Sequence, residues 1–519
     1  MLHTKPSGAS SGKGFFIANP REKSMAFAEI ARLYERDKHF PLRTLRQNLL
    51  VKFRDGSFFD ILGIPFNQET EESTANYIPL RRRMPAIHVS WANEVLQDVS
   101  SLLFGEGHFP EIESEDEGLA ERLADAVEEC DLSSVMSEVA FLSSVGSCVI
   151  FIRFLGEDGN LKPVVSAEDS TWFTPTFDPK SPWKLVSLTE RYKVKGSALR
   201  EMGFAIPDDN LQSDHWWKTV WDESAETGFI PVKVEVGDDG QPNDATVVDR
   251  TRTIRHDLGF TPAIWVRLPG GDSLDGRCLF APAIDTIIEA DYQLSQLGRG
   301  LKYSQDPLKV ISLGSEIPDD FKKIVAGSDL LVLPQGSEAK LLETNGESAR
   351  AVMEYVSLLR RYAVRAISGS PIDPERLTVP QSGRAMEILN MPLIQLADKL
   401  RSVFDRTLRD LIGMILSGSE KRPVFVRGKK LEAPENPDFR FRWPAWYPPT
   451  AMDRLQDVQA ATAAVTGGTL STESAVRFLS APFDIDSPDD ELKTLIKEKD
   501  DNARRAQQQR PDSADSQTA

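Results

Sequence analysis

The chain is poor in the residues that build most catalytic and metal centres. It holds three cysteines and six histidines in 519 residues. Cys130, Cys148 and Cys278 form neither a C-x-x-C pair nor an even-numbered framework, so we expect reduced, buried thiols. The histidines are scattered, without H-E-x-x-H, G-x-S-x-G, a dinucleotide fingerprint or a phosphate loop. We therefore expect no metal, no cofactor and no enzyme, although Asp373 and Glu375 could pair as acid and base in an unrecognised nuclease or transferase.

Long apolar runs and an excess of positive charge are missing as well. The best apolar run, residues 145–155, is interrupted by Ser147 and Arg153 and is too short to span a bilayer. No signal peptide opens the sequence, so we expect a soluble protein. Lys and Arg number 61 against 79 Asp and Glu, a net charge of −18. That balance argues against coating nucleic acid or an anionic membrane by bulk attraction, and leaves room for a local basic patch.

Helical patterns dominate the first part of the chain after a polar arm, residues 1–25. Apolar residues recur at helical spacing over residues 26–50 and 88–104, and the second of these stops at Gly105. The acidic run 111–117 is expected as solvated charge at a helix start, with a metal site as the alternative. One amphipathic helix is expected to follow over residues 119–145.

Residues 147–268 have a β-rich character. Alternating apolar runs are separated by Gly, Asp and Pro turns, which predicts a mixed β subdomain. Trp216, Trp217 and Trp221 are interpreted as core residues of that subdomain, with a ligand platform as the alternative. The runs lie at residues 149–154, 184–188, 232–236 and 246–254.

Two helices flank a small insert in the next part of the chain. Pro282 begins the first, which Pro307 ends, and the second covers residues 347–367. They are expected to stand antiparallel. The insert carries two apolar runs, residues 308–312 and 329–333, whose edges we expect to pair with another subunit.

A Pro/Gly/Ser-rich loop, residues 368–383, leads to a long helix over residues 384–416. Pro392 lies inside that predicted helix and is expected to kink it. The alternating runs 423–427 and 439–443 are expected to return to the β subdomain. Helices 451–466, 472–479 and 489–505, with N-caps at Ser471 or Thr472 and at Ser487, would end the ordered chain before a polar tail.

The order of these pieces, over residues 26–500, resembles the portal proteins of tailed double-stranded DNA bacteriophages, of the siphophage type. Val99–Gly107 (VSSLLFGEG) resembles that family's helix-ending turn, and residues 287–307 look like the first stem helix leading into the clip. Gly369-Ser-Pro through Gln381-Ser-Gly-Arg-Ala385 is similar to the tunnel loop and the start of the kinked helix. Trp446-Tyr-Pro-Pro and Gly467–Thr472 resemble the return to the wing and the start of the crown.

The resemblance implies an α+β subunit with nine parts, assembling as a ring, usually of twelve. A mixed α/β wing, a two-helix stem, a small α/β clip, a long kinked helix and a helical crown would follow one another. The expected parts are a flexible arm (1–25), wing (26–280), first stem helix (281–305), clip (306–345), second stem helix (346–367), tunnel loop (368–383), kinked helix and wing return (384–449), crown (450–505) and disordered tail (506–519).

The resemblance also implies a function and partners. The ring would be the channel for double-stranded DNA at one capsid vertex, docking the terminase large subunit during packaging and later the head–tail adaptor. The major capsid protein and the scaffold protein would be further partners, and the protein would reside in the virion, and in the host cytoplasm during assembly. The family has no catalytic residues and no cofactor. A non-portal head–tail adaptor or scaffold protein is the alternative.

Eight basic residues are candidates for facing the DNA, because such a channel needs sparse, non-specific phosphate contacts. The competing interpretation is that stem arginines pair with acids of a neighbouring helix, such as Glu289, Glu354 or Asp291. The candidates are Arg299, Lys302, Arg350, Arg360, Arg361, Arg365, Arg376 and Arg384.

Overall fold

The structure is a computed structural model and forms two compact units. One comprises Met1–Pro371 and Gln395–Pro444, the other Ile372–Ile394 and Ala445–Ala519. The expected α+β class is confirmed. No helix among the described residues is both long and apolar enough to cross a membrane. The residues that the structure describes are 39–71, 76–156, 160–238, 240–271, 274–305, 309–312, 330–333, 346–368, 390–434, 437–446, 451–480, 483, 485 and 487–508.

Short helices begin the first unit. Helix α3 ends before Gly105, as predicted, and a Cβ on Gly105 would lie 2.4 Å from the Ser101 carbonyl oxygen. The expected single helix over residues 119–145 is wrong. Asp131 adopts φ 47° and divides it in two, a left-handed conformation that Asp tolerates better than most residues. The helices are α2 (Leu42–Arg54), α3 (Trp91–Phe104), α4 (Glu117–Glu129) and α5 (Leu132–Leu142).

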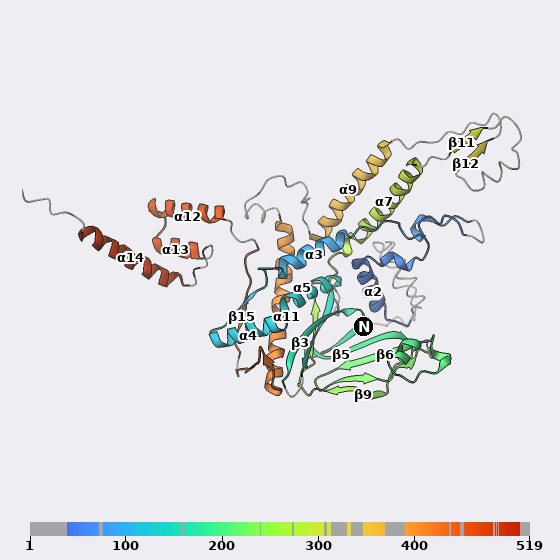
Figure 1. Cartoon of the computed structure of the whole chain (residues 1–519), viewed down its shortest axis with the longest axis horizontal. Coiled ribbons are helices and arrows are strands. Elements are labelled where there is room, and N and C mark those ends of the chain that lie inside the picture. The colour runs from blue at the N-terminus through green and yellow to red at the C-terminus, as the bar shows by residue number, and fades with distance from the viewer. Residues whose placement is uncertain are drawn as a thin grey trace, which may run out of the picture. The chain divides into compact units, whose positions relative to one another are not determined.

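Two antiparallel sheets build the predicted β subdomain (Figure 1). Their facing sides share a core that includes Phe151, Leu188 and Trp221. Trp216 is also fully buried, so two of the three tryptophans are confirmed as core. The first sheet has the order β10 (Ala263–Arg267), β2 (Ser147–Leu155), β3 (Lys162–Asp169). The second has β4 (Phe173–Asp178), β5 (Ser181–Lys195), β6 (Asp214–Trp221), β7 (Ala225–Phe229) and β9 (Val248–Arg255), with β8 (Val232–Lys233) on β6.

The acidic run and the C-terminal strands pair differently from the prediction. Strand β1 (Glu111–Glu113) pairs with β15 (Arg440–Arg442), so part of the acidic run is a strand and β15 does not join the β subdomain. Glu113 forms ion pairs with both arginines of β15. Asp116 caps α4 by accepting the Leu119 N–H at 3.2 Å. A hairpin of β13 (Phe425–Val426) and β14 (Lys429–Lys430) reaches the β subdomain through a bridge between Val424 and Leu161.

Helices α7 (Ile284–Gln305) and α9 (Gly346–Ser368) lie side by side, and the short turn η7 (Ala281–Ala283) precedes α7 (Figure 1). We call this helix pair the stem hairpin. Both predicted strands of the insert are present as β11 (Lys309–Ser312) and β12 (Leu330–Leu333), which pair parallel to each other. Pairing of their edges with another subunit stays a prediction.

Helix α11 (Met391–Lys421) corrects the prediction for Pro392. Asn390 lies in a turn, so Pro392 occupies the first turn of α11, where its missing N–H leaves no helical bond unmade. It therefore does not lie inside a helix that is continuous through Asn390, and the expected kink relative to residues 384–389 lies outside the described residues. Phe404 packs against Phe104 of α3 with ring centroids 5.4 Å apart. The predicted loop 369–383 and helical residues 384–389 lie outside the described residues.

The described residues from Ala451 onward form three helices of the second unit. Ser471 accepts the Ser474 N–H at 3.1 Å, and Ser487 accepts the Asp490 N–H at 3.4 Å, so both predicted N-caps are confirmed. The helices are α12 (Ala451–Thr466), α13 (Thr472–Ser480) and α14 (Pro488–Gln508).

Candidate functional site

The root of the stem hairpin, the end at which α7 begins and α9 ends, is fixed by a buried carboxylate. Asp291 of α7 is fully buried; it accepts the Val89 N–H at 2.8 Å and lies 2.7 Å from Nδ1 of His88. Burial raises the pKa of Asp291, while the bond to His88 opposes that rise. One turn further, Ser295 accepts the Ile87 N–H at 3.0 Å. Because a buried charge without partners is costly, these contacts hold residues 87–89 on α7.

The strap, residues 76–89, is anchored to α7 a second time. The hydroxyl of Tyr292 donates to the Arg83 carbonyl at 2.8 Å. Arg83 is itself buried and donates to the Phe66 carbonyl at 3.0 Å and to the Tyr77 hydroxyl at 2.9 Å. The first three turns of α7 therefore have a rigid support on the strap side.

Three of the candidate cations have acid partners within the chain. Arg299 pairs with Glu69, Arg360 of α9 lies 3.4 Å from Glu94 of α3, and Arg350 lies 3.5 Å from Glu354 one turn along α9. The pairing of Arg360 braces α9 against α3. Arg299 and Arg360 thus serve intrachain packing before any DNA contact.

Lys302, Arg361 and Arg365 are exposed. Within the described part of the chain none of the three has a hydrogen bond or an ion pair. They are the unneutralised cations of the described stem hairpin. The two remaining candidates, Arg376 and Arg384, lie outside the described residues.

The three acids expected to pair with arginines of a neighbouring helix differ in how accessible they are. Asp291 is buried on His88 and is not open to a second chain, whereas Glu354 is exposed and pairs with Arg350 along α9. Glu289 remains partly exposed, and its carboxylate lies 3.8 Å from the exposed guanidinium of Arg81. Asp285 is exposed and, among the described residues, unpaired, and the sequence pattern did not single it out.

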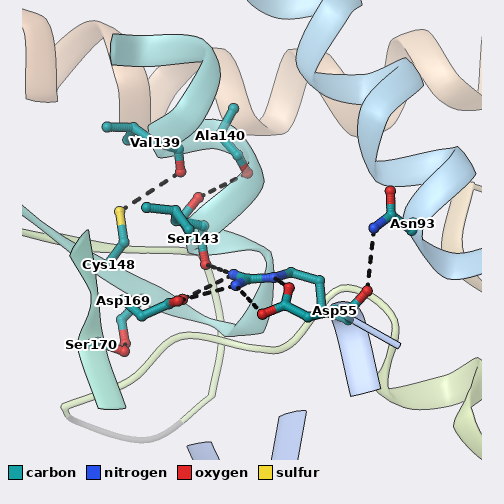
Figure 2. A network of polar contacts seen from close by, with 11 residues as sticks. Asp55, Asn93, Val139, Ala140, Ser143, Cys148, Asp169 and Ser170 are labelled. Carbon is teal, nitrogen blue, oxygen red and sulfur yellow. Dashed lines mark hydrogen bonds and ion pairs between the residues drawn. The ribbon is translucent and has the colours of Figure 1, made fainter. Parts of the chain in front are cut away.

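Two arginines of α2, the buried Arg54 and the partly buried Arg43, fasten the helical part to the β subdomain. Arg54 donates to both oxygens of Asp169 at 2.9 and 3.1 Å, and to Asp55 at 2.8 Å (Figure 2). Arg43 donates to both oxygens of Asp275 at 2.6 and 2.8 Å. The sequence holds a signal for this pair. Arg43 and Arg54 are eleven residues apart, about three helical turns, and so lie on the same apolar face of α2, where a charged residue needs a buried partner.

A crevice of about 370 Å³ opens at one end of the β subdomain. Glu168, Glu190 and Glu226 line it from three strands, together with Arg153 and Arg252. Burial, followed by the charge of Glu168, raises the pKa of Glu190 to about 7. The described residues contain no group of three or more His, Cys, Asp or Glu placed to hold a metal ion.

A larger open groove, about 1370 Å³, runs between β10, the start of β5 and α11. Trp183 is exposed there, with the Arg406 and Arg267 guanidinium carbons 4.7 and 5.0 Å from its ring centre. The three cysteines are buried and free, as predicted. Burial raises the pKa of the Cys130 and Cys278 thiols to about 12, which keeps them protonated and unreactive.

Comparison with known proteins finds a distant likeness among solved structures. No protein-family model matches the chain, and no curated protein matches it. Among solved structures, a chain from the "Neck of empty GTA particle computed with C6 symmetry" matches at 10% identity, covering 76% of this chain and 90% of that one, with a TM-score of 0.35. An identity and a TM-score this low do not establish a common fold or function.

Proposed function

We propose that the protein is a portal subunit: a structural component of a ring that forms the channel for double-stranded DNA at one vertex of a virus head. The observation that carries the proposal is the stem hairpin. Its root is braced by buried contacts to the strap and by an exposed ion pair to α3, while its exposed surface carries cations that have no acid partner among the described residues.

The charge distribution supports a conduit more than a nucleic-acid coat. DNA passing in any sequence needs contacts to phosphate, and many such contacts would hold it in place. A chain of net charge −18 with a few free cations on one helix pair meets both requirements. Under this proposal the protein is not an enzyme.

The partners under this proposal follow from the ring's position. It would dock the terminase large subunit during packaging and the head–tail adaptor afterwards, beside the major capsid protein and the scaffold protein. The small parallel pair β11–β12 between the two stem helices would belong to the docking part, the clip. The protein would then be found in the virion.

The mass and the shape of the purified protein test the proposal. Light scattering with negative-stain imaging is expected to give rings of about twelve 57.8 kDa chains around an axial hole. A particle of one or two chains without a hole, at every concentration and also after co-expression with the scaffold protein, would refute it. A ring that joins tails but does not bind terminase would favour the adaptor alternative.

A further inference from the structure

The outer face of α9 carries a charged stripe. Arg350, Glu354, Arg361 and Arg365 follow one another at spacings of four, seven and four residues, which places them on one face of the helix. Arg350 and Glu354 satisfy each other. Arg361 and Arg365, at the root end, are the part of the stripe without a partner among the described residues.

These two arginines point away from their own hairpin. Val356, Leu359 and Ala363 form the buried face of α9, which packs on α7 and α3. Arg361 and Arg365 are exposed and lie roughly opposite that face at about 100° per residue. Acids of the same α7 are thus out of their reach.

The outer face of α7 carries the complementary charge. Asp285 and Glu289 are one turn apart and precede Gln293 on the same face, and Gln293 donates to Glu289 at 2.8 Å. Asp285 has no partner among the described residues. Asp291, which might have shared this role by sequence alone, is buried on the strap side instead.

The two acids of α7 and the two arginines of α9 lie at matching distances along their helices from the root. Helix α7 begins at Ile284 and α9 ends at Ser368, both at the root. At about 1.5 Å per residue, Asp285 and Arg365 lie roughly 2 to 5 Å from the root, and Glu289 and Arg361 roughly 8 to 10 Å from it. Each helix therefore presents two charges one turn apart, in the same order along the stem.

We propose that, in the assembled ring, Arg361 and Arg365 of one copy pair with Glu289 and Asp285 of the next copy. A ring needs a contact between two different faces of the same chain, and α9 and α7 supply a basic and an acidic face. Tyr355 and Tyr362, 42% and 57% exposed, flank the stripe and would be covered by the same contact. The proposal rests on the ring of the proposed function, and assigns these two arginines to neighbouring subunits rather than to DNA.

Charge reversal on both faces tests the contact. The basic-face variant is Arg361→Glu with Arg365→Glu, and the acidic-face variant is Asp285→Lys with Glu289→Lys. Each alone places like charges at every contact and is expected to raise the concentration for half-assembly at least tenfold in sedimentation velocity. Mixed one to one, the two variants can alternate around an even-numbered ring with every contact restored, and are expected to assemble within threefold of wild type.

The matched control is Arg350→Glu, on the same stripe but satisfied within its own helix, which is expected to leave assembly within threefold of wild type. The neutral pair Arg361→Gln with Arg365→Gln, expected to weaken assembly less than reversal does, covers the case in which a reversed chain fails to fold by circular dichroism. Two outcomes would overturn the inference and leave the portal proposal standing. In the first, the wild type forms rings and the charge-reversed variants assemble equally well; in the second, the one-to-one mixture of the two variants assembles no better than either variant alone. Reversed rings that form normally but lose DNA would assign the arginines to the channel. A wild type that never forms rings would refute both proposals.

Discussion

Substitution of Arg54 is expected to lower the free energy of unfolding more than most single substitutions. Its side chain is 2% exposed and makes two hydrogen bonds to Asp169 of β3 and two to Asp55 (Figure 2). Its Nη1 also donates to the Leu142 carbonyl at 3.3 Å. Burial lowers the pKa of Arg54, but the bonds to Asp55 and Asp169 outweigh that effect, so the pKa is raised and the group stays charged.

The size of the loss follows from what Arg54→Met leaves behind. Removing one partner of a buried ion pair costs about 3–5 kcal/mol, because the other charge remains buried. Asp169 is 29% exposed and Asp55 44% exposed, so water replaces part of what each loses. We therefore expect a loss of roughly 2–4 kcal/mol in the free energy of unfolding. Methionine keeps an apolar contact with Phe141, over whose ring the guanidinium lies at 4.8 Å.

Urea unfolding followed by tryptophan fluorescence measures this loss. Arg54→Lys keeps the charge but not the two-pronged geometry, and should fall between Arg54→Met and wild type. Arg440→Met removes an exposed ion pair with Glu113 and should cost less than about 1 kcal/mol. If Arg54→Met were no more destabilising than Arg440→Met, the buried pair would not fasten α2 to the β subdomain in the way described.

Three further predictions concern single positions. Burial raises the pKa of Glu190 to about 7. The contribution of the protonated Glu190 carboxyl to the free energy of unfolding is therefore fully present below its unfolded pKa of 4.5 and is lost as pH rises through 7. Glu190→Gln should therefore match wild type in thermal unfolding near pH 5 and exceed it at pH 8 by up to about 3 kcal/mol, whereas parallel pH profiles would contradict the buried site. Gly146 has φ 121° and a Cβ there would lie 2.5 Å from the Gly276 carbonyl oxygen, so Gly146→Ala should lower the free energy of unfolding by about 2 kcal/mol; an unchanged free energy would show that the backbone relaxes. Asp291→Ala should speed amide exchange of Val89 roughly tenfold to a hundredfold, and an unchanged rate would mean that the strap is held elsewhere.

Local periodicity predicted the long helices well because one apolar face is buried along most of their length. The second stem helix was expected over residues 347–367 and is found at Gly346–Ser368. Its burial is less regular than the pattern: Val356 and Leu359 are buried, while Tyr355 and Tyr362 are exposed. An apolar periodicity therefore located the helix but not the width of its buried face, which depends on what packs against it.

The site could be predicted only in part, because its partners are distant in sequence. Asp291 was expected as an acid that an arginine of a neighbouring helix could reach, yet it is buried against His88 and Val89, some two hundred residues earlier. The strand at Glu111–Glu113 reads locally as acidic charge and becomes a strand through Arg440 and Arg442. Neither outcome has a local signal, since a buried or paired charge depends on a tertiary partner.

The stem's charges then sort into three roles that differ in their dependence on salt. Arg299, Arg350 and Arg360 pair within the chain, and Arg361 and Arg365 are assigned above to the next copy. Among the described stem residues this leaves Lys302 as the cation free to meet phosphate. With one such contact per chain, a ring of about twelve chains could neutralise at most about twelve phosphates, so its affinity for DNA would fall as salt rises, by a slope of about −0.9 for each contact made at one time. DNA could then slide through the ring under a motor's force, because each contact is weak enough to break as the next one forms.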